Sequence, residues 1–128
     1  MRILFVAGAM LALATTAAAQ TKPAKPTGDA AAGKTAFTAR CAMCHGAEAQ
    51  GTPMAPKLRA VFGKKAASHA DQKYSSALKA SGLQWTPANL DAFLKAPAQA
   101  VKGTTMMIGV PNAKDRENLI AYLATIPK

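Results

Sequence analysis

The chain contains only two cysteines, Cys41 and Cys44, and His45 follows the second one directly. Residues three positions apart face the same side of a helical turn, so both thiols can reach one bound group. In an oxidising compartment such a pair can instead form a disulfide or a thioredoxin-like redox pair. That interpretation requires a preceding strand, for which there is no pattern, and leaves His45 without a role. A zinc site is a third possibility, but it would have three ligands and no evident fourth.

The full pattern, Cys-x-x-Cys-His, is typical of covalent attachment of a c-type haem. The two thiols add to the two vinyl groups of the porphyrin, and the next side chain then points at the iron. We therefore expect one haem c bound through Cys41 and Cys44, with His45 as an iron ligand.

The sixth position of the iron decides what such a haem can do. An empty position permits ligand binding or catalysis, whereas methionine saturates the iron, raises its potential and favours electron transfer. The glycine-flanked segment KGTTMMIGVP offers Met106 and Met107, and the adjacent pair suggests one ligand and one packing residue. Met54, in the loop after the attachment motif, and His69, in a polar loop, are the alternatives.

The first 19 residues have the features of a secretory signal peptide. Arg2 supplies a positive start, ILFVAGAMLALA is an apolar run, and Ala17 and Ala19 form an A-x-A cleavage site. The run is shorter than the about 20 apolar residues of a spanning helix. We expect cleavage after Ala19, export to the periplasm and no stable membrane insertion; an uncleaved anchor is the alternative.

The charge balance indicates an acidic partner. The 128 residues include 16 basic and 6 acidic ones, a net charge of +10, and losing Arg2 with residues 1–19 leaves +9. Such a chain is attracted to acidic surfaces in a salt-dependent way. Scattered lysines and an aromatic content of 5% argue against nucleic acid. We expect a monomer that meets the acidic face of another protein.

Beyond the leader, the sequence predicts one helical domain. Residues 20–28 are rich in proline and polar residues and are predicted to be a flexible leader. The domain, residues 29–128, contains four helical patterns and no period-2 strand pattern. The predicted helices cover residues 28–40, 74–82, 85–97 and 112–127.

The third of these helices has the clearest boundaries, with Thr86 as its cap, Pro87 at its first position and Pro97 at its end. The loops at 46–57 and 66–73 are long and poor in apolar residues. Four short helices with few aromatics bury little surface for a domain of about 100 residues. A large apolar cofactor would supply the missing core.

Residues 28–126 resemble the mitochondrial-type (class I) cytochrome c family, which includes small soluble bacterial cytochromes c. Five blocks follow the order of that family: GDAAAGKTAFTARCAMCH, APKLRAVFGKKA, YSSALKASGLQW, LKAPAQAVKGTTM and RENLIAYL. The resemblance implies an all-α cytochrome c fold, with about four to five short helices and long loops wrapped around one covalently attached haem. It also implies a soluble one-electron carrier between respiratory or photosynthetic redox complexes, not an enzyme.

The resemblance further implies how the iron is held. Met106, three residues after Gly103, corresponds to the sixth ligand, so that His45 and Met106 bind the metal. Pro56 would accept a hydrogen bond from His45 Nδ1–H through its backbone carbonyl and so orient the ring.

Other positions match or depart from the polar network of the family. Tyr74 and Trp85 resemble the pair that hydrogen-bonds a buried haem propionate. Lys64 stands where the family has an arginine near the propionates; it keeps the charge and loses the planar fork. Phe93 replaces the tyrosine that hydrogen-bonds the methionine sulfur, and Leu78 replaces an asparagine. The missing hydroxyl keeps open an alternative function, a haem enzyme or ligand sensor with a labile sixth position.

The resemblance also concerns the packing and the docking face. Gly33 and Phe37 are expected to pack against the last helix, at Leu119 and Tyr122, where glycine permits close approach. Several lysines that ring the haem edge in relatives are absent, at Ala98, Gln99 and Thr105, while Arg40 and Lys102 remain. The expected partners are acidic docking faces of membrane redox complexes or dehydrogenases.

Overall fold

A computed structural model describes residues 22–127, so the predicted signal peptide lies outside the described part. Within that part the chain forms six helices joined by loops and no strand; Lys65 and Gln84 form one isolated bridge. The helices are α1 (Ala30–Arg40), α2 (Ala42–His45), α3 (Ser76–Ala80), α4 (Pro87–Lys95), α5 (Pro97–Ala100) and α6 (Ala113–Thr125). The all-α prediction is confirmed.

Helix boundaries follow the capping residues in the sequence. The Asp29 carboxylate accepts hydrogen bonds from the first turn of α1, and the Thr86 hydroxyl accepts one from Asn89 N–H, with Pro87 at the start of α4. One expectation is corrected. Pro97 does not only end α4, which stops at Lys95; it also opens α5. The fixed φ of proline suits the first position of a helix, so the same residue can stop one helix and start the next.

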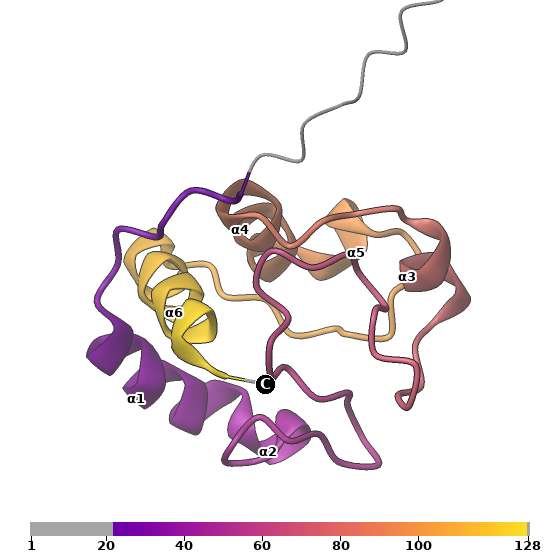
Figure 1. Ribbon diagram of the computed structural model, residues 1–128, viewed down its shortest axis with the longest axis horizontal. Helices are drawn as coiled ribbons and strands as arrows, with labels where there is room; N and C mark the ends of the chain where they lie inside the picture. Colours follow the sequence, from indigo (N-terminus) through magenta and orange to yellow (C-terminus); the bar gives the residue numbers. More distant parts are fainter. Residues whose placement is uncertain (1–21, 128) are drawn as a thin grey trace, which may run out of the picture.

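The first and last helices cross, and their contact anchors the fold (Figure 1). A Cβ atom on Gly33 would lie 2.0 Å from Asn118 O and 2.8 Å from Tyr122 Cβ, so the two helices touch at the glycine. The rings of Phe37 and Tyr122 pack 5.3 Å apart, and Phe37 and Leu119 are both 1% exposed. The predicted packing of Gly33 and Phe37 against α6 is confirmed.

The described part of the leader, residues 22–28, lies against the domain. Thr27 Oγ1 donates to Glu117 Oε1 at 2.8 Å, and a Cβ atom on Gly28 would meet the Glu117 carbonyl oxygen at 2.2 Å. A Cβ atom on Gly63 would lie 2.8 Å from Pro23 Cγ. Thr27 and Gly28 thus lie beside Glu117 of α6. The flexible leader over residues 20–28 stays a prediction.

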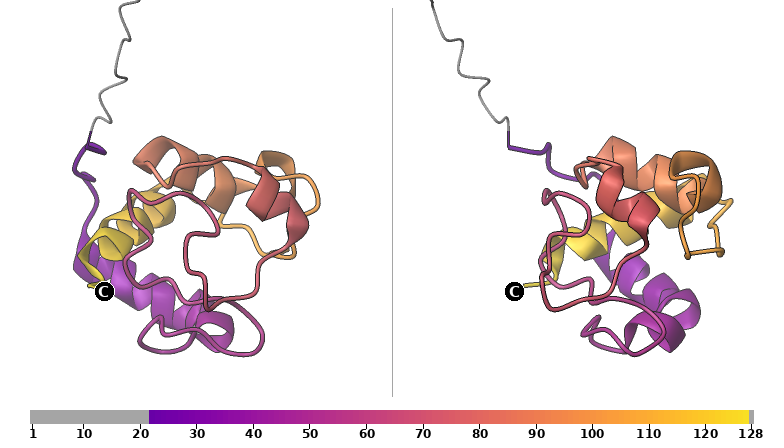
Figure 2. Two further views of the ribbon diagram at one scale, coloured as in Figure 1. Left: turned by 45° about the vertical axis from the view of Figure 1, so that its right-hand side comes forward. Right: turned by 90° about the vertical axis from the view of Figure 1, so that its right-hand side faces the viewer.

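The remaining chain surrounds a central cavity. The long segment between α2 and α3 passes over one side of the molecule, and α3, α4, α5 and the segment before α6 form the wall away from α1 and α2 (Figures 1 and 2). Within residues 22–127, none of the helices has both the length and the apolar character needed to cross a bilayer. The fold therefore brings the attachment motif, the loops and the Met106 segment around one space.

Candidate functional site

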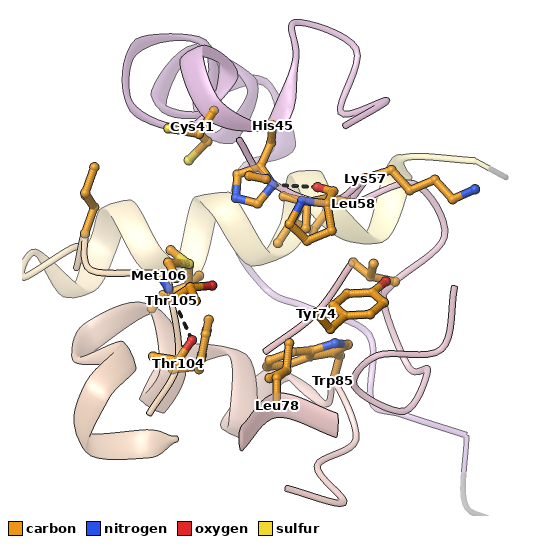
Figure 3. A pocket seen from close by; sticks show the side chains of 18 of the residues that line it. Cys41, His45, Lys57, Leu58, Tyr74, Leu78, Trp85, Thr104, Thr105 and Met106 are labelled. Carbon is orange, nitrogen blue, oxygen red and sulfur yellow. Dashed lines mark hydrogen bonds between the residues drawn. The ribbon is translucent and has the colours of Figure 1, made fainter. Parts of the chain in front are cut away.

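The central cavity has a volume of about 390 Å³, and all of the predicted site residues line it except Lys64 and the alternative ligand His69. Cys41, Cys44 and His45 lie on the α2 wall, and Tyr74, Trp85 and Met106 come from the other walls (Figure 3). The rest of the lining is mainly apolar: Phe37, Leu58, Val61, Leu78, Leu90, Phe93, Leu94, Val110, Leu119 and Leu123. The sequence predicted that the helices alone would leave the core incomplete. This cavity is the incomplete part, and an apolar cofactor can fill it.

His45 is oriented by the backbone of the following loop. Its Nδ1 lies 2.7 Å from the Pro56 carbonyl oxygen (Figure 3). Because a carbonyl only accepts, Nδ1 carries the hydrogen and Nε2 keeps its lone pair. Burial lowers the pKa of His45 below its ordinary value, and the bond to Pro56 opposes this in part. The ring is therefore neutral at pH 7 and can bind a metal through Nε2.

Cys41 and Cys44 present two half-buried free thiols to the cavity from a single turn. Burial raises the pKa of the Cys41 thiol, although Arg40 opposes the shift. The zinc alternative lacks ligands, since no three His, Cys, Asp or Glu side chains converge within residues 22–127. Two thiols three residues apart, directly before a histidine, suit thioether attachment of a haem better than a zinc site, which takes four ligands.

The two adjacent methionines differ in their environment. Met106 is half-buried, packs against the hydrophobic core and lines the cavity, and its N–H donates to Thr104 Oγ1 at 3.3 Å. Met107 and Met54 also belong to the cavity lining, but their side chains are 77% and 73% exposed. The expectation that Met107 packs in the core is wrong, because neighbours in an extended segment point in opposite directions. Met106 is the methionine that the fold turns inward.

Tyr74 and Trp85 lie together on the wall below His45 in Figure 3. Trp85 is 9% exposed, and its ring packs edge-on against Phe93 with centroids 5.1 Å apart. Burial raises the pKa of Tyr74, so its hydroxyl stays protonated at neutral pH and remains a donor. Both residues thus place polar hydrogens beside a mainly apolar cavity.

Two predicted residues do not reach the cavity. The Lys64 side chain is exposed and lies outside the lining, while Lys65 belongs to it. Lys64 instead accepts a hydrogen bond from Trp85 N–H through its carbonyl, at 2.8 Å, and this pairing turns its side chain away. His69 is half-buried, with Nε2 2.9 Å from the Arg59 carbonyl, and it also lies outside the cavity lining.

Two residues of the site escaped sequence reasoning. Thr104 is 9% exposed, lines the cavity and supports Met106. The only hint in the sequence was its position, two residues before Met106 in a glycine-flanked loop. Arg116 is 6% exposed and bonds Asp91 and the backbone of the Met106 segment. A charged residue in an amphipathic helix is ordinarily expected in solvent, so the helical pattern contained no sign of this role.

The comparison with protein families identifies the chain. The sequence model of one family, described as "Cytochrome c", matches residues 30–127. The chain belongs to the cytochrome c family. Covalently attached haem c is the cofactor of this family, and electron transport is its process. The motif at Cys41, Cys44 and His45, together with the apolar cavity beside it, fits one such haem.

Individual relatives agree with this assignment. A cytochrome c of Tetrahymena pyriformis is 43% identical over 102 residues, which cover 79% of this chain and 92% of that protein. "Cytochrome c-type cyt cy" of Rhodobacter capsulatus is 42% identical over 83% of this chain, but the match spans only 53% of that longer protein. The solved structure of cytochrome cH from Methylobacterium extorquens superimposes with a TM-score of 0.70 at 43% identity, covering 77% of this chain and 99% of that one.

Proposed function

We propose that this cytochrome c is a monomeric, periplasmic carrier of single electrons, with His45 and Met106 as the two axial ligands of one haem iron. The observation that supports it best is the pairing of a neutral imidazole and an inward-facing thioether at one apolar cavity. When bound, the haem supplies a one-electron couple between ferric and ferrous iron. Acidic faces of membrane redox complexes or dehydrogenases are the proposed partners.

The chain contributes ligands that need not move. Pro56 holds the His45 ring through the 2.7 Å hydrogen bond, and Thr104 restrains the backbone at Met106. Since both ligands are neutral and held by their surroundings, the same pair can serve both oxidation states with little rearrangement. The apolar walls exclude water and thereby raise the strength of the remaining polar contacts. We further propose that Tyr74 and Trp85 donate hydrogen bonds to a buried haem propionate.

The first test is a paired measurement on the mature wild-type protein. The intact mass is expected to equal the chain from Gln20 to Lys128 plus one haem, which would support both cleavage after Ala19 and covalent attachment. The ferric spectrum is expected to contain the charge-transfer band between methionine sulfur and iron. A haem that lacks this band and binds small ligands without competition would contradict the proposed carrier and favour the enzyme or sensor alternative.

The docking face can be tested through its charges. Lys102 is exposed, and Arg40 is half-exposed and only loosely paired with Asp115 at 3.7 Å. Neutralising both, as Arg40→Gln with Lys102→Gln, is expected to lower the association rate with an acidic redox partner several-fold at low salt. At high salt, where charges are screened, the difference should vanish, and the reduction potential should stay unchanged.

Stopped-flow electron transfer at several salt concentrations measures this effect. Lys34→Gln is a matched control, because Lys34 is exposed on α1 and lies outside the cavity lining. Equal rates for the double variant, the control and the wild type would show that the partner docks elsewhere.

A further inference from the structure

We propose that Arg116 is a positioning residue that, with Asp91, holds the Met106 segment (residues 104–111) so that the methionine sulfur stays on the iron. The inference depends on the ligation by Met106 proposed above. It assigns a role in the site to an ion pair between the buried Arg116 on α6 and the half-exposed Asp91 on α4, neither of which lines the cavity.

Arg116 joins three parts of the molecule. Its Nε donates to Asp91 Oδ1 on α4 at 2.7 Å, and its Nη1 donates to the carbonyl oxygens of Val110 at 3.0 Å and Pro111 at 2.8 Å. The residue is 6% exposed, so its charge is costly unless it is paired. The planar guanidinium can serve a carboxylate and two carbonyls at once, which the single ammonium group of lysine cannot do in the same geometry.

The Met106 segment has few other attachments. Its beginning is tied by Thr104 N–H, which donates to Val101 O at 3.1 Å, and its end by Val110 N–H, which donates to Leu94 O at 2.7 Å. Within the segment, Met106 N–H donates to Thr104 Oγ1. Between these ties, the N–H groups at positions 105 and 107–109 donate to no acceptor among residues 22–127. Met106 therefore sits in a short span whose far end is fixed by Val110 and Arg116 together.

The energetic consequence is a change in how often the segment opens. Hydrogen bonds that involve a charged group are the stronger class, and Arg116 makes two of them to the backbone of the segment. If these bonds break when the segment swings away from the cavity, removing them favours the open form. Asp91 has a half-exposed side chain, which water can solvate once its partner is gone. Removing Arg116 therefore destabilises the closed form of the segment more than the open form.

Imidazole binding to the ferric haem protein reports this opening directly. Imidazole can take the sixth position only when Met106 has left, so its apparent Kd falls as the open fraction rises. We expect Arg116→Gln to bind imidazole at least about tenfold more tightly than the wild type, equivalent to about 1.4 kcal/mol. Arg116→Lys should give a smaller shift, and Asp91→Asn, which keeps an acceptor for Nε, the smallest.

The matched control is Lys114→Gln on the same helix. It removes an exposed pair with Glu117, at 2.9 Å, that does not touch the Met106 segment, and its imidazole affinity should stay within about twofold of the wild type, the range of a surface pair. Urea unfolding of each variant measures global stability separately. Amide exchange adds a local readout: in Arg116→Gln, Val110 N–H should exchange faster while the α1 amides do not change.

The outcomes separate the two proposals. If the wild-type ferric spectrum lacks the sulfur-to-iron band, the ligation by Met106 fails. If the band is present and the imidazole affinities of the Arg116 and Asp91 variants match the control, the positioning role is overturned, even where their unfolding free energies drop. Should Arg116→Gln fail to assemble with haem, Arg116→Lys and Asp91→Asn decide the question by the same criterion.

Discussion

Replacing Met106 by alanine is expected to abolish the sulfur-to-iron charge-transfer band of the ferric protein and to lower its reduction potential. Thioether sulfur favours ferrous iron, whereas water or an oxygen or nitrogen ligand in its place favours the ferric state. The expected drop is on the order of tenths of a volt, within the roughly 0.8 V that axial ligands span in haem proteins. Optical titration against redox mediators measures both quantities on one sample.

The neighbouring methionines supply the controls. Met107→Ala removes a side chain that is 77% exposed, and Met54→Ala removes one that is 73% exposed. Each variant should keep the band and shift the potential far less than Met106→Ala does. If Met107→Ala instead abolishes the band and Met106→Ala preserves it, the segment binds the iron through the other sulfur, and the proposed ligand is wrong.

The second large effect concerns Gly33, at the crossing of α1 and α6. Gly33→Ala places a methyl group where Asn118 O lies 2.0 Å away and Tyr122 Cβ 2.8 Å away, so the two helices must separate. We expect a loss of about 3 kcal/mol in the free energy of unfolding, the upper end for overpacking. Urea unfolding of the haem protein, followed by far-ultraviolet circular dichroism, measures it.

Helix propensity makes the opposite prediction, and this sharpens the test. Alanine is better than glycine inside a helix by about 1 kcal/mol, so propensity alone would make Gly33→Ala stabilising. Ala32→Gly, at an exposed position of the same helix, calibrates that effect and should destabilise by about 1 kcal/mol. A stabilised Gly33→Ala variant would show that the contact between the two helices is looser than the structure has it.

The parts of the site that were predictable from sequence are those whose chemistry lies within a single turn or cap. Cys41, Cys44 and His45 lie within one stretch of five residues, so their joint presentation needs no distant residue. The cap at Thr86 is likewise local, because its side chain bonds an amide three residues along. Comparison with family blocks added Pro56 and Met106, which no local rule could have paired with His45.

Predictions failed where a side chain's direction depends on contacts far along the chain. Lys64 and Lys65 carry the same charge, and only the pairing with residues 84 and 85 turns the second toward the cavity. The burial and bonding of Arg116 could not be predicted for the same reason, since its three acceptors come from α4 and from the loop before α6.

By itself, the sequence determined the all-helical class, the attachment motif and the positive charge, since these depend on residue types and on spacings of a few positions. Only the tertiary structure decided that Met106 is half-buried while Met107 is exposed, that Lys65 replaces Lys64 at the cavity, and that Arg116 ties the Met106 segment to two helices. Those outcomes depend on which distant segments meet, and burial and hydrogen bonding there outweigh the local preferences of each residue.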